Sequence, residues 1–322
     1  MNSLSKSKRD YYSLEITTVL GCSVNCMYCP QSALSQASRD VLNKVLTFDN
    51  FKKYLSNVPK NVHIHWTGYS EPCLIKDLDK MITHVHEKGH SQLISTTLEG
   101  NSKSADFVSR FPFFKSFTLH LPDSHGLMKG IANKKGYLER VLKLFPYIYD
   151  INKEKLDLLT FGKQFHPDIE SLIKFYKEKN INLKVERRDH LHERAGQVDT
   201  TKIDDLEKFV GKHENNSKTD KENKFSFRTN SELKLKENID KKFNSNEENL
   251  NNWFCSYKRL SQPVLLPDGR TNICCQDYQL SCITGDLSSQ SYEDLVKYEN
   301  IKEKFFSGKL NPCIKCEYYR RL

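Results

Sequence analysis

The stretch YSLEITTVLGCSVNCMYCPQ, residues 12–31, joins an apolar, β-branched run to three closely spaced cysteines. Residues 12–20 have the composition of a buried strand. Cys22, Cys26 and Cys29 follow it with the spacing C-x3-C-x2-C. A structural zinc site takes four nitrogen or sulfur ligands, and this short loop supplies three. Three thiolates can instead bind three irons of a [4Fe–4S] cube and leave the fourth iron open to an exogenous ligand. A zinc loop or a chance cluster is the alternative.

Outward from this loop, apolar runs alternate with amphipathic stretches as far as residue 198. The runs predict strands within 12–20, 61–68, 91–98, 116–121, 156–162 and 181–188. The amphipathic stretches predict helices within 48–58, 74–89, 137–145 and 168–180. Strands that alternate with helices predict a parallel α/β sheet that curls towards a barrel. In such barrels the working residues lie at the C-terminal ends of the strands, where the cysteine loop falls.

Composition restricts the classes of protein that the chain can represent. Of its 322 residues 37% are hydrophobic and 28% are charged, and no apolar run approaches the length of a membrane span. No signal peptide is recognisable, so we expect a cytoplasmic protein without a membrane partner. Ten cysteines in a reducing compartment indicate metal or redox chemistry rather than disulfides. The net charge of +9 is spread along the chain, which favours an ordinary solvated surface over a nucleic-acid site.

Three regions are expected along the chain. Residues 1–200 form the barrel, and 201–252 form a charged, Asn/Lys-rich linker or insertion with few apolar residues. Residues 253–322 form a cysteine-rich segment that is small for a self-sufficient core, so a metal would help it to fold.

Four cysteines of the last region have spacings suited to one metal site. Cys255 and Cys274 flank a hairpin with a Pro-Asp-Gly turn, and Cys313 and Cys316 form a C-x2-C pair. Four such thiolates can hold one zinc ion or one iron–sulfur cluster. Cys275 is an alternative to Cys274 as a ligand, or else a buried thiol.

The three-cysteine loop, with Tyr28 before its last cysteine, resembles that of the radical S-adenosylmethionine (radical SAM) superfamily. In TGYSEP (67–72) the last four residues resemble the family's Gly-Gly-Glu-Pro motif, although Tyr69 and Ser70 replace the glycines. The resemblance implies that Glu71 accepts a hydrogen bond from the ammonium group of SAM.

Two further segments resemble SAM-binding segments of the same family. STTLEG (95–100) is similar to a Thr-Thr-Asn-Gly turn, with Leu98 in place of the Asn, and ERAGQV (193–198) is similar to Ser-Arg-Ala-Gly-Asn. The resemblance implies that Thr96 and Thr97 face SAM and that Arg194 reaches its carboxylate. A surface ion pair is the alternative for Arg194.

The resemblance also implies a mechanism. SAM chelates the open iron, and the reduced cluster cleaves it to a 5′-deoxyadenosyl radical, which abstracts a hydrogen atom from the substrate. The electron would come from a flavodoxin- or ferredoxin-type protein.

The C-terminal cysteines resemble those of SPASM/twitch auxiliary domains. The resemblance implies one auxiliary [4Fe–4S] cluster on Cys255, Cys274, Cys313 and Cys316, with zinc as the alternative. The expected fold class is therefore α/β: a partial (β/α)6 TIM-like barrel followed by a small C-terminal cysteine-rich auxiliary-cluster domain.

Several other residues are candidates for contact with the substrate. The thiols of Cys73 and Cys282 are candidate hydrogen-atom donors, with a role as small core residues as the alternative. His63 and His65 share one face of the second predicted strand. Further candidates by position, each equally open to a structural role, are His120, Asp123, Arg187 and Arg188.

Three hypotheses for function follow. The first is oxidation or epimerisation of a sugar-type or other small-molecule carbinol, as in twitch-type aminoglycoside dehydrogenases. The second is maturation of a ribosomally made peptide, although the 21 residues before Cys22 are too few for a winged-helix leader-binding region. The third is a non-enzymatic, metal-stapled module that binds nucleic acid, in which the Glu71 motif would have no role.

Overall fold

The structure is a computed structural model that describes residues 13–100, 107, 109–188, 194, 197–199, 253–255, 262–296, 316 and 319–321. The predicted linker at 201–252 lies outside these residues, and so does Cys313. The boundaries proposed for the three regions therefore stay a prediction.

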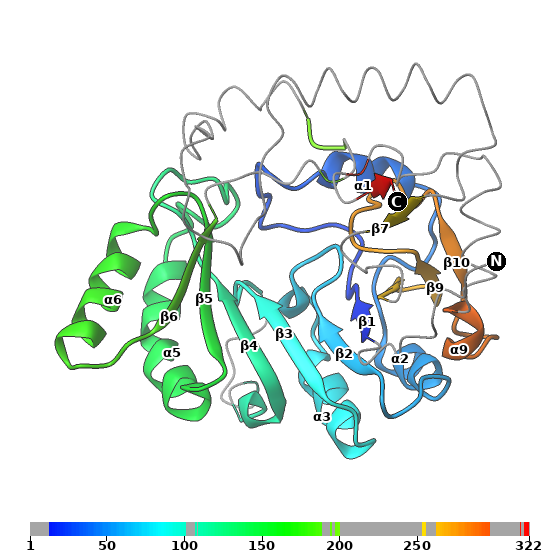
Figure 1. Cartoon of the computed structure of the whole chain (residues 1–322), viewed down its shortest axis with the longest axis horizontal. Coiled ribbons are helices and arrows are strands. Elements are labelled where there is room, and N and C mark those ends of the chain that lie inside the picture. The colour runs from blue at the N-terminus through cyan, green and yellow to red at the C-terminus, as the bar shows by residue number, and fades with distance from the viewer. Residues whose placement is uncertain are drawn as a thin grey trace.

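Six parallel strands in chain order form the body of the molecule (Figure 1). Five of the six strands lie within the ranges that the sequence predicts, and β4 begins two residues before its range. The fold class is confirmed as α/β with a parallel sheet. The strands are β1 (Ser13–Ile16), β2 (His63–Trp66), β3 (Gln92–Thr96), β4 (Phe114–His120), β5 (Leu156–Phe161) and β6 (Lys184–Arg188).

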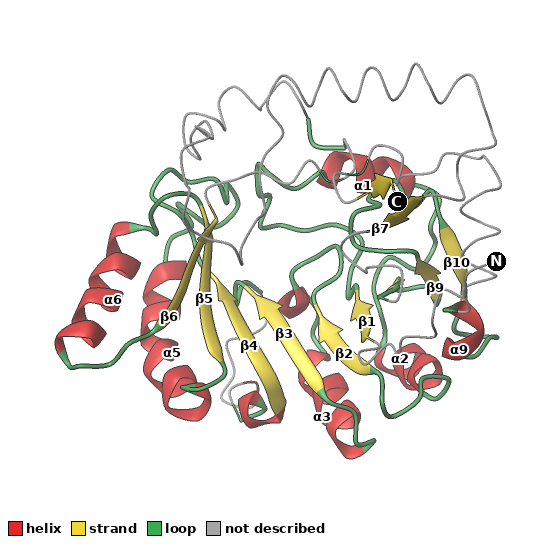
Figure 2. Cartoon of the chain, viewed as in Figure 1, coloured by secondary structure: helices red, strands yellow, loops and turns green. Residues whose placement is uncertain are grey.

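Alternation along the strands decides which side of the sheet is covered. In β2 the side chains of Ile64 and Trp66 are fully buried, whereas those of His63 and His65 project from the opposite face and are half-buried. Trp66 packs on Phe51 of the helix α2, with ring centroids 5.3 Å apart. Figure 2 shows the four principal helices outside the row of strands. They are α2 (Phe48–Leu55), α3 (Leu78–Glu87), α5 (Tyr137–Asn152) and α6 (Pro167–Glu178).

Helices α1 and α5 are among those that differ from the sequence-based expectation. The helix α1 (Gln31–Ala37) was not predicted, and it has no side-chain cap. The helix α5 was predicted to end at residue 145, but it continues through Pro146 to Asn152. Buried residues on both sides of the proline, Val141 and Ile148, hold α5 against the core and so offset the hydrogen bond that proline cannot make.

Three strands of the C-terminal segment extend the same sheet. The strand β8 (Val264–Leu265) pairs with β1 in parallel, and the backbone N–H of Thr17 donates to the carbonyl of Leu265 at 2.9 Å. Two antiparallel strands, β9 (Arg270–Asn272) and β10 (Ile283–Asp286), follow outward. The predicted Pro-Asp-Gly turn joins β8 to β9, and with β1 to β6 these three strands form a nine-stranded sheet.

Two further described strands pair with each other. The strand β7 (Trp253–Cys255) lies antiparallel to β11 (Tyr319–Arg321), with Cys255 opposite Tyr319. The short helix α9 (Tyr292–Leu295) contacts the start of β1, where the hydroxyl of Tyr292 donates to the carbonyl of Ser13 at 3.1 Å. None of the described helices is long and apolar enough to span a lipid bilayer.

Candidate active site

The three-cysteine loop lies at the C-terminal end of β1. A turn closes it, in which the N–H of Cys29 donates to the carbonyl of Cys26 at 3.1 Å and Asn25 adopts a left-handed conformation with φ of 49°. The N–H of Met27 donates to the carbonyl of Leu127 at 2.8 Å, which ties the loop to the segment after β4. The side chains of Cys22, Cys26 and Cys29 are all half-buried.

The loop thiols and the carboxylate of Glu71 influence one another electrostatically. The pKa of Cys22 is raised to about 11, mainly by burial and in part by the negative charges of Glu71 and Cys29, against the opposing effect of two backbone hydrogen bonds. Burial also raises the pKa of Cys26, followed by the charge of Cys29. The loop thus brings three half-buried thiols close enough to influence one another electrostatically, and such a set of sulfur donors suits an iron–sulfur cluster.

Among the described residues, no three His, Cys, Asp or Glu side chains are arranged to hold a single metal ion. In a cubane cluster each cysteine binds a different iron, so the sulfurs need not converge on one point.

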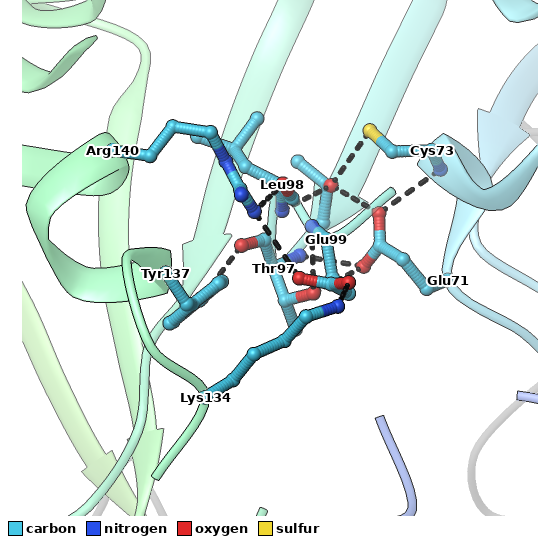
Figure 3. A network of polar contacts seen from close by, with 9 residues as sticks. Glu71, Cys73, Thr97, Leu98, Glu99, Lys134, Tyr137 and Arg140 are labelled. Atoms are coloured by element: carbon cyan, nitrogen blue, oxygen red, sulfur yellow. Dashed lines mark hydrogen bonds and ion pairs between the residues drawn. The ribbon is translucent and has the colours of Figure 1, made fainter. Parts of the chain in front are cut away.

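Glu71 joins the ends of β2 and β3 through four hydrogen bonds (Figure 3). Its Oε1 accepts from the N–H of Cys73 at 3.0 Å and from the hydroxyl of Thr96. Its Oε2 accepts from the N–H and the hydroxyl of Thr97, at 2.6 and 2.8 Å. The carboxylate is buried, and burial raises its pKa although these hydrogen bonds oppose the rise.

These contacts qualify the contact expected between Glu71 and SAM. A carboxylate offers about four lone-pair positions, and protein donors already use that number. An additional donor, such as the SAM ammonium, must share or replace one of these bonds. The contact of Glu71 with SAM therefore stays a prediction. Its hydrogen bonds between the ends of β2 and β3 are observed.

The turn after β3 has an unusual backbone. Leu98, which stands where the family motif has Asn, has a φ of 60°, a left-handed value that Asn adopts more readily than Leu. Its side chain is fully buried, which offsets the conformational cost. Gly100 has a φ of 106°, and a Cβ there would collide with the backbone carbonyl of Cys73. The turn therefore needs glycine at this position.

A group of polar side chains from the region of α5 holds this turn (Figure 3). The hydroxyl of Tyr137 donates to the carbonyl of Thr97 at 2.7 Å. Arg140 donates to the carbonyl of Leu98 and to the buried carboxylate of Glu99, each at 3.1 Å, and Lys134 pairs with the other oxygen of Glu99. The turn that carries the two threonines is thus fixed from both of its sides.

The turn after β2 packs closely against the segment after β1. Gly68 has a φ of 60°, and a Cβ there would collide with the side chain and backbone of Thr17. The hydroxyl of Thr17 accepts a hydrogen bond from the N–H of Tyr69 at 3.1 Å. The fully buried hydroxyl of Tyr69 donates to the carbonyl of Cys274 at 2.7 Å, so this turn also contacts the C-terminal segment.

Tyr28 of the cysteine loop contacts His120 at the end of β4. The Tyr28 hydroxyl is 3.2 Å from Nε2 of His120, and its ring stacks on Phe161 at 4.3 Å between centroids. The pKa of His120 is lowered to about 3, mainly by burial and in part by the charges of Arg188 and Arg194. His120 is therefore a neutral hydrogen-bonding group near neutral pH.

The other predicted substrate contacts fall in three environments. Nε2 of His65 lies 3.2 Å from the hydroxyl of Ser95, next to it on β3. Cys73 is buried in the main core, with its sulfur 3.2 Å from the Thr96 hydroxyl. Cys282 is buried beside Cys274 in a small apolar cluster. Their roles in hydrogen transfer stay predictions.

The remaining candidates by position also have protein partners. Both oxygens of Asp123 accept backbone hydrogen bonds, from His125 at 2.7 Å and from Leu127 at 2.8 Å. Arg187 pairs with Glu170 at 2.8 Å.

Parts of the predicted auxiliary site can be followed. Cys274 is buried, and Cys316 is half-buried. The pairing of β7 with β11 places Cys255 opposite Tyr319, three residues after Cys316. The fourth predicted ligand, Cys313, lies outside the described residues.

Sequence reasoning missed two residues that contact the loop. The hydroxyl of Tyr278 lies 3.3 Å from the sulfur of Cys29, and Nε2 of Gln31 lies 3.4 Å from the same atom. The guanidinium of Arg194 lies over the Tyr278 ring, 5.9 Å from its centroid. No motif points to Tyr278, because 249 residues separate it from Cys29.

No protein-family model matches the sequence. No curated protein matches it either.

Solved structures do match its fold. BtrN in complex with AdoMet and 2-DOIA is 14% identical, with a TM-score of 0.51 over 97% of this chain and 94% of that chain. Native anSMEcpe with bound AdoMet is 12% identical, with a TM-score of 0.51 over 95% and 86%. Streptococcus suis SuiB bound to precursor peptide SuiA is 14% identical, with a TM-score of 0.52 over 95% and 69%.

These likenesses define the fold as an open parallel α/β barrel with a C-terminal extension. It is the fold of the radical SAM enzymes, among them members of the SPASM/twitch type, as the resemblance in sequence implied.

Proposed function

We propose that the chain is a radical SAM enzyme whose [4Fe–4S] cluster is held by Cys22, Cys26 and Cys29. The observation that best supports this proposal is the position of the loop at the end of β1. There the charge of Glu71, at the end of β2, raises the pKa of Cys22. When bound, the cluster and SAM supply a radical that abstracts hydrogen from the substrate.

The chain's own residues then position the cofactor and restrict water. Thr96 and Thr97, which Glu71 orients, lie on the turn proposed to face SAM. Two further cofactor contacts are proposed. They are Tyr28 of the loop, which lies between His120 and Phe161, and Arg194, which lies over Tyr278. Burial of most of these groups strengthens their polar contacts.

For the reaction we propose oxidation or epimerisation of a sugar-type or other small-molecule carbinol. An auxiliary [4Fe–4S] cluster on Cys255, Cys274, Cys313 and Cys316 would assist it. The match over 94% of BtrN, which was solved with AdoMet and the small molecule 2-DOIA, supports this proposal. A flavodoxin- or ferredoxin-type protein would supply the electron.

A second candidate is modification of a ribosomally made peptide. The similarity to SuiB, solved with its precursor peptide at a TM-score of 0.52, favours it, although the match covers 69% of that chain. To separate the two proposed reactions, the protein is incubated with SAM and either a panel of carbinols or a panel of peptides. Mass spectrometry then shows which substrate is consumed.

The first test is iron and sulfide content after anaerobic reconstitution, together with 5′-deoxyadenosine formation. Wild type should hold about eight irons and cleave SAM, whereas the Cys22/Cys26/Cys29→Ala variant should hold about four and cleave none. SAM cleavage that survives the triple substitution would refute the proposed function. About four irons plus one zinc in wild type would instead assign zinc to the C-terminal site and favour redox-neutral chemistry.

A further inference from the structure

Two polar side chains from different parts of the chain approach the sulfur of Cys29. Nε2 of Gln31 lies 3.4 Å from it and donates also to the carbonyl of Tyr69 at 2.7 Å. The hydroxyl of Tyr278 lies 3.3 Å from it, on a side chain that is 4% exposed. A tyrosine hydroxyl buried this deeply needs a polar partner, and this sulfur is one.

The position of Tyr278 is fixed by its surroundings. Its ring packs edge-on against Tyr69, with centroids 4.8 Å apart and planes at 65°. The turn that carries it is tied to the barrel, because Tyr69 donates to the carbonyl of Cys274 and Asn272 donates to the carbonyl of Asp277, both at 2.7 Å. The hydroxyl is therefore directed to Cys29 by packing on both sides.

We propose that Tyr278 donates a hydrogen bond to the Cys29 thiolate when the cluster is bound, and that this bond raises the reduction potential of the cluster. The proposal rests on the proposed function. A cysteine that ligates iron is a thiolate, which can only accept, so the phenol must be the donor. An external one-electron reductant adds negative charge to the cluster and its ligands, and a hydrogen bond to a ligand sulfur then strengthens.

The C-terminal segment would thus adjust a cluster that the N-terminal loop holds. Tyr278 follows Cys274, a proposed ligand of the auxiliary site, by four residues. If Tyr278 merely fills space beside Tyr69, its hydroxyl has no influence on the potential.

The test is an anaerobic dithionite titration of the full-length, reconstituted protein, followed by electron paramagnetic resonance (EPR). The signal that is lost in the Cys22/Cys26/Cys29→Ala variant belongs to the cluster in question. In Tyr278→Phe, iron content should equal that of wild type, and reduction should become about tenfold less favourable, a downward shift of ~59 mV for one electron.

Tyr292→Phe is the matched control, because the hydroxyl of that buried tyrosine of the same segment donates to the backbone carbonyl of Ser13. Its potential should equal that of wild type. An unchanged potential in Tyr278→Phe with full iron content would overturn the inference and leave the proposed function intact. A wild-type protein without any cluster on the loop would overturn both.

A second measurement does not depend on how well Tyr278→Phe folds. The Gln31→Leu variant lacks the amide that donates to the Cys29 sulfur. It is reduced, and samples are frozen from H2O and from D2O. Electron–nuclear double resonance should show a strongly coupled exchangeable proton from the Tyr278 hydroxyl. Its absence would overturn the inference.

Discussion

At Glu71 each carboxylate oxygen accepts one backbone N–H and one threonine hydroxyl. A hydroxyl can rotate and become an acceptor, but a backbone N–H cannot. This asymmetry makes the site sensitive to a change of one atom, because an amide placed there must direct its NH2 at one of two N–H groups.

We therefore predict that Glu71→Gln is destabilising in either orientation of its amide. With its NH2 towards Cys73 or towards Thr97, one buried N–H loses its acceptor, at a cost of about 1–3 kcal/mol. The free energy of unfolding from urea titrations measures this. Glu139→Gln, at an exposed position on α5, is the control. Equal stability of the two variants would contradict the prediction.

His120 predicts a pH dependence of stability. Its folded pKa of about 3 lies below the value of about 6.5 in the unfolded chain, so between these values the unfolded state binds more protons. The contribution of neutral His120 to the free energy of unfolding is fully present above pH 6.5. It is lost on acidification, by at most about 1.4 kcal/mol per pH unit. His120→Gln should flatten the stability profile between pH 6.5 and 4.5.

Urea titrations at a series of pH values check this, with the exposed His125→Gln as control. If the free energy of unfolding of His120→Gln changed with pH as steeply as that of wild type, a buried neutral imidazole at His120 would be contradicted. The signal for His120 in the sequence was only its position near a strand end, because the burial and the arginine charges that hold it neutral come from distant elements.

At the scale of elements, the turn after β3 lies directly against the 3-10 helix η1 (Pro72–Leu74). The contact is backbone to backbone at Gly100, and Cys73 on the other side also donates to Glu71. Movement at one turn therefore displaces the other.

We predict that Gly100→Ala is more destabilising than Gly89→Ala. Both positions have left-handed backbones, with φ of 106° and 81°, so both substitutions carry a conformational cost of about 1–2 kcal/mol. A Cβ at Gly89 meets nothing within 4 Å, whereas at Gly100 it must displace the carbonyl of Cys73. Thermal unfolding compares the two, and SAM cleavage should fall only in Gly100→Ala. Equal melting temperatures would show that the turns can separate without cost.

The elements themselves were largely predictable, because periodicity is a local signal. The six strands fall in runs whose alternation or apolar character spans only a few residues. Errors arose where local rules meet tertiary packing. Pro146 predicts the end of a helix, but buried neighbours on both sides carry α5 past it. Residues 31–37 offer neither an acidic first turn nor a side-chain cap, so α1 gave no signal.

For the whole molecule, the decisive feature is that β8 to β10 continue the barrel sheet at β1. The spacing of cysteines predicted a C-terminal metal site but could not predict this pairing, because strand register between distant segments leaves no mark in either sequence. The contact of Tyr278 with Cys29 depends on the same pairing and was equally hidden.

This architecture predicts that the C-terminal strands stay in place without the auxiliary metal. Cys313/Cys316→Ala should lose about four irons. It should keep wild-type far-ultraviolet circular dichroism and retain SAM cleavage better than substrate turnover, since β8 is held by hydrogen bonds to β1. The Cys22/Cys26/Cys29→Ala variant is the reciprocal control. Global unfolding of the double variant would show that the metal, rather than the sheet, holds the segment.

The pairing of β1 with β8 also has a consequence for synthesis on the ribosome. The strand β1 emerges from the ribosome before β8, so the edge of β1 that pairs with β8 lacks this partner until residues near 265 have been translated. Until then the cysteine loop lacks the wall that Tyr278 provides, 249 residues downstream of Cys29. On this side, a nascent chain therefore leaves the Cys29 thiol open to oxygen and to stray metal ions until the turn between β9 and β10 has been made.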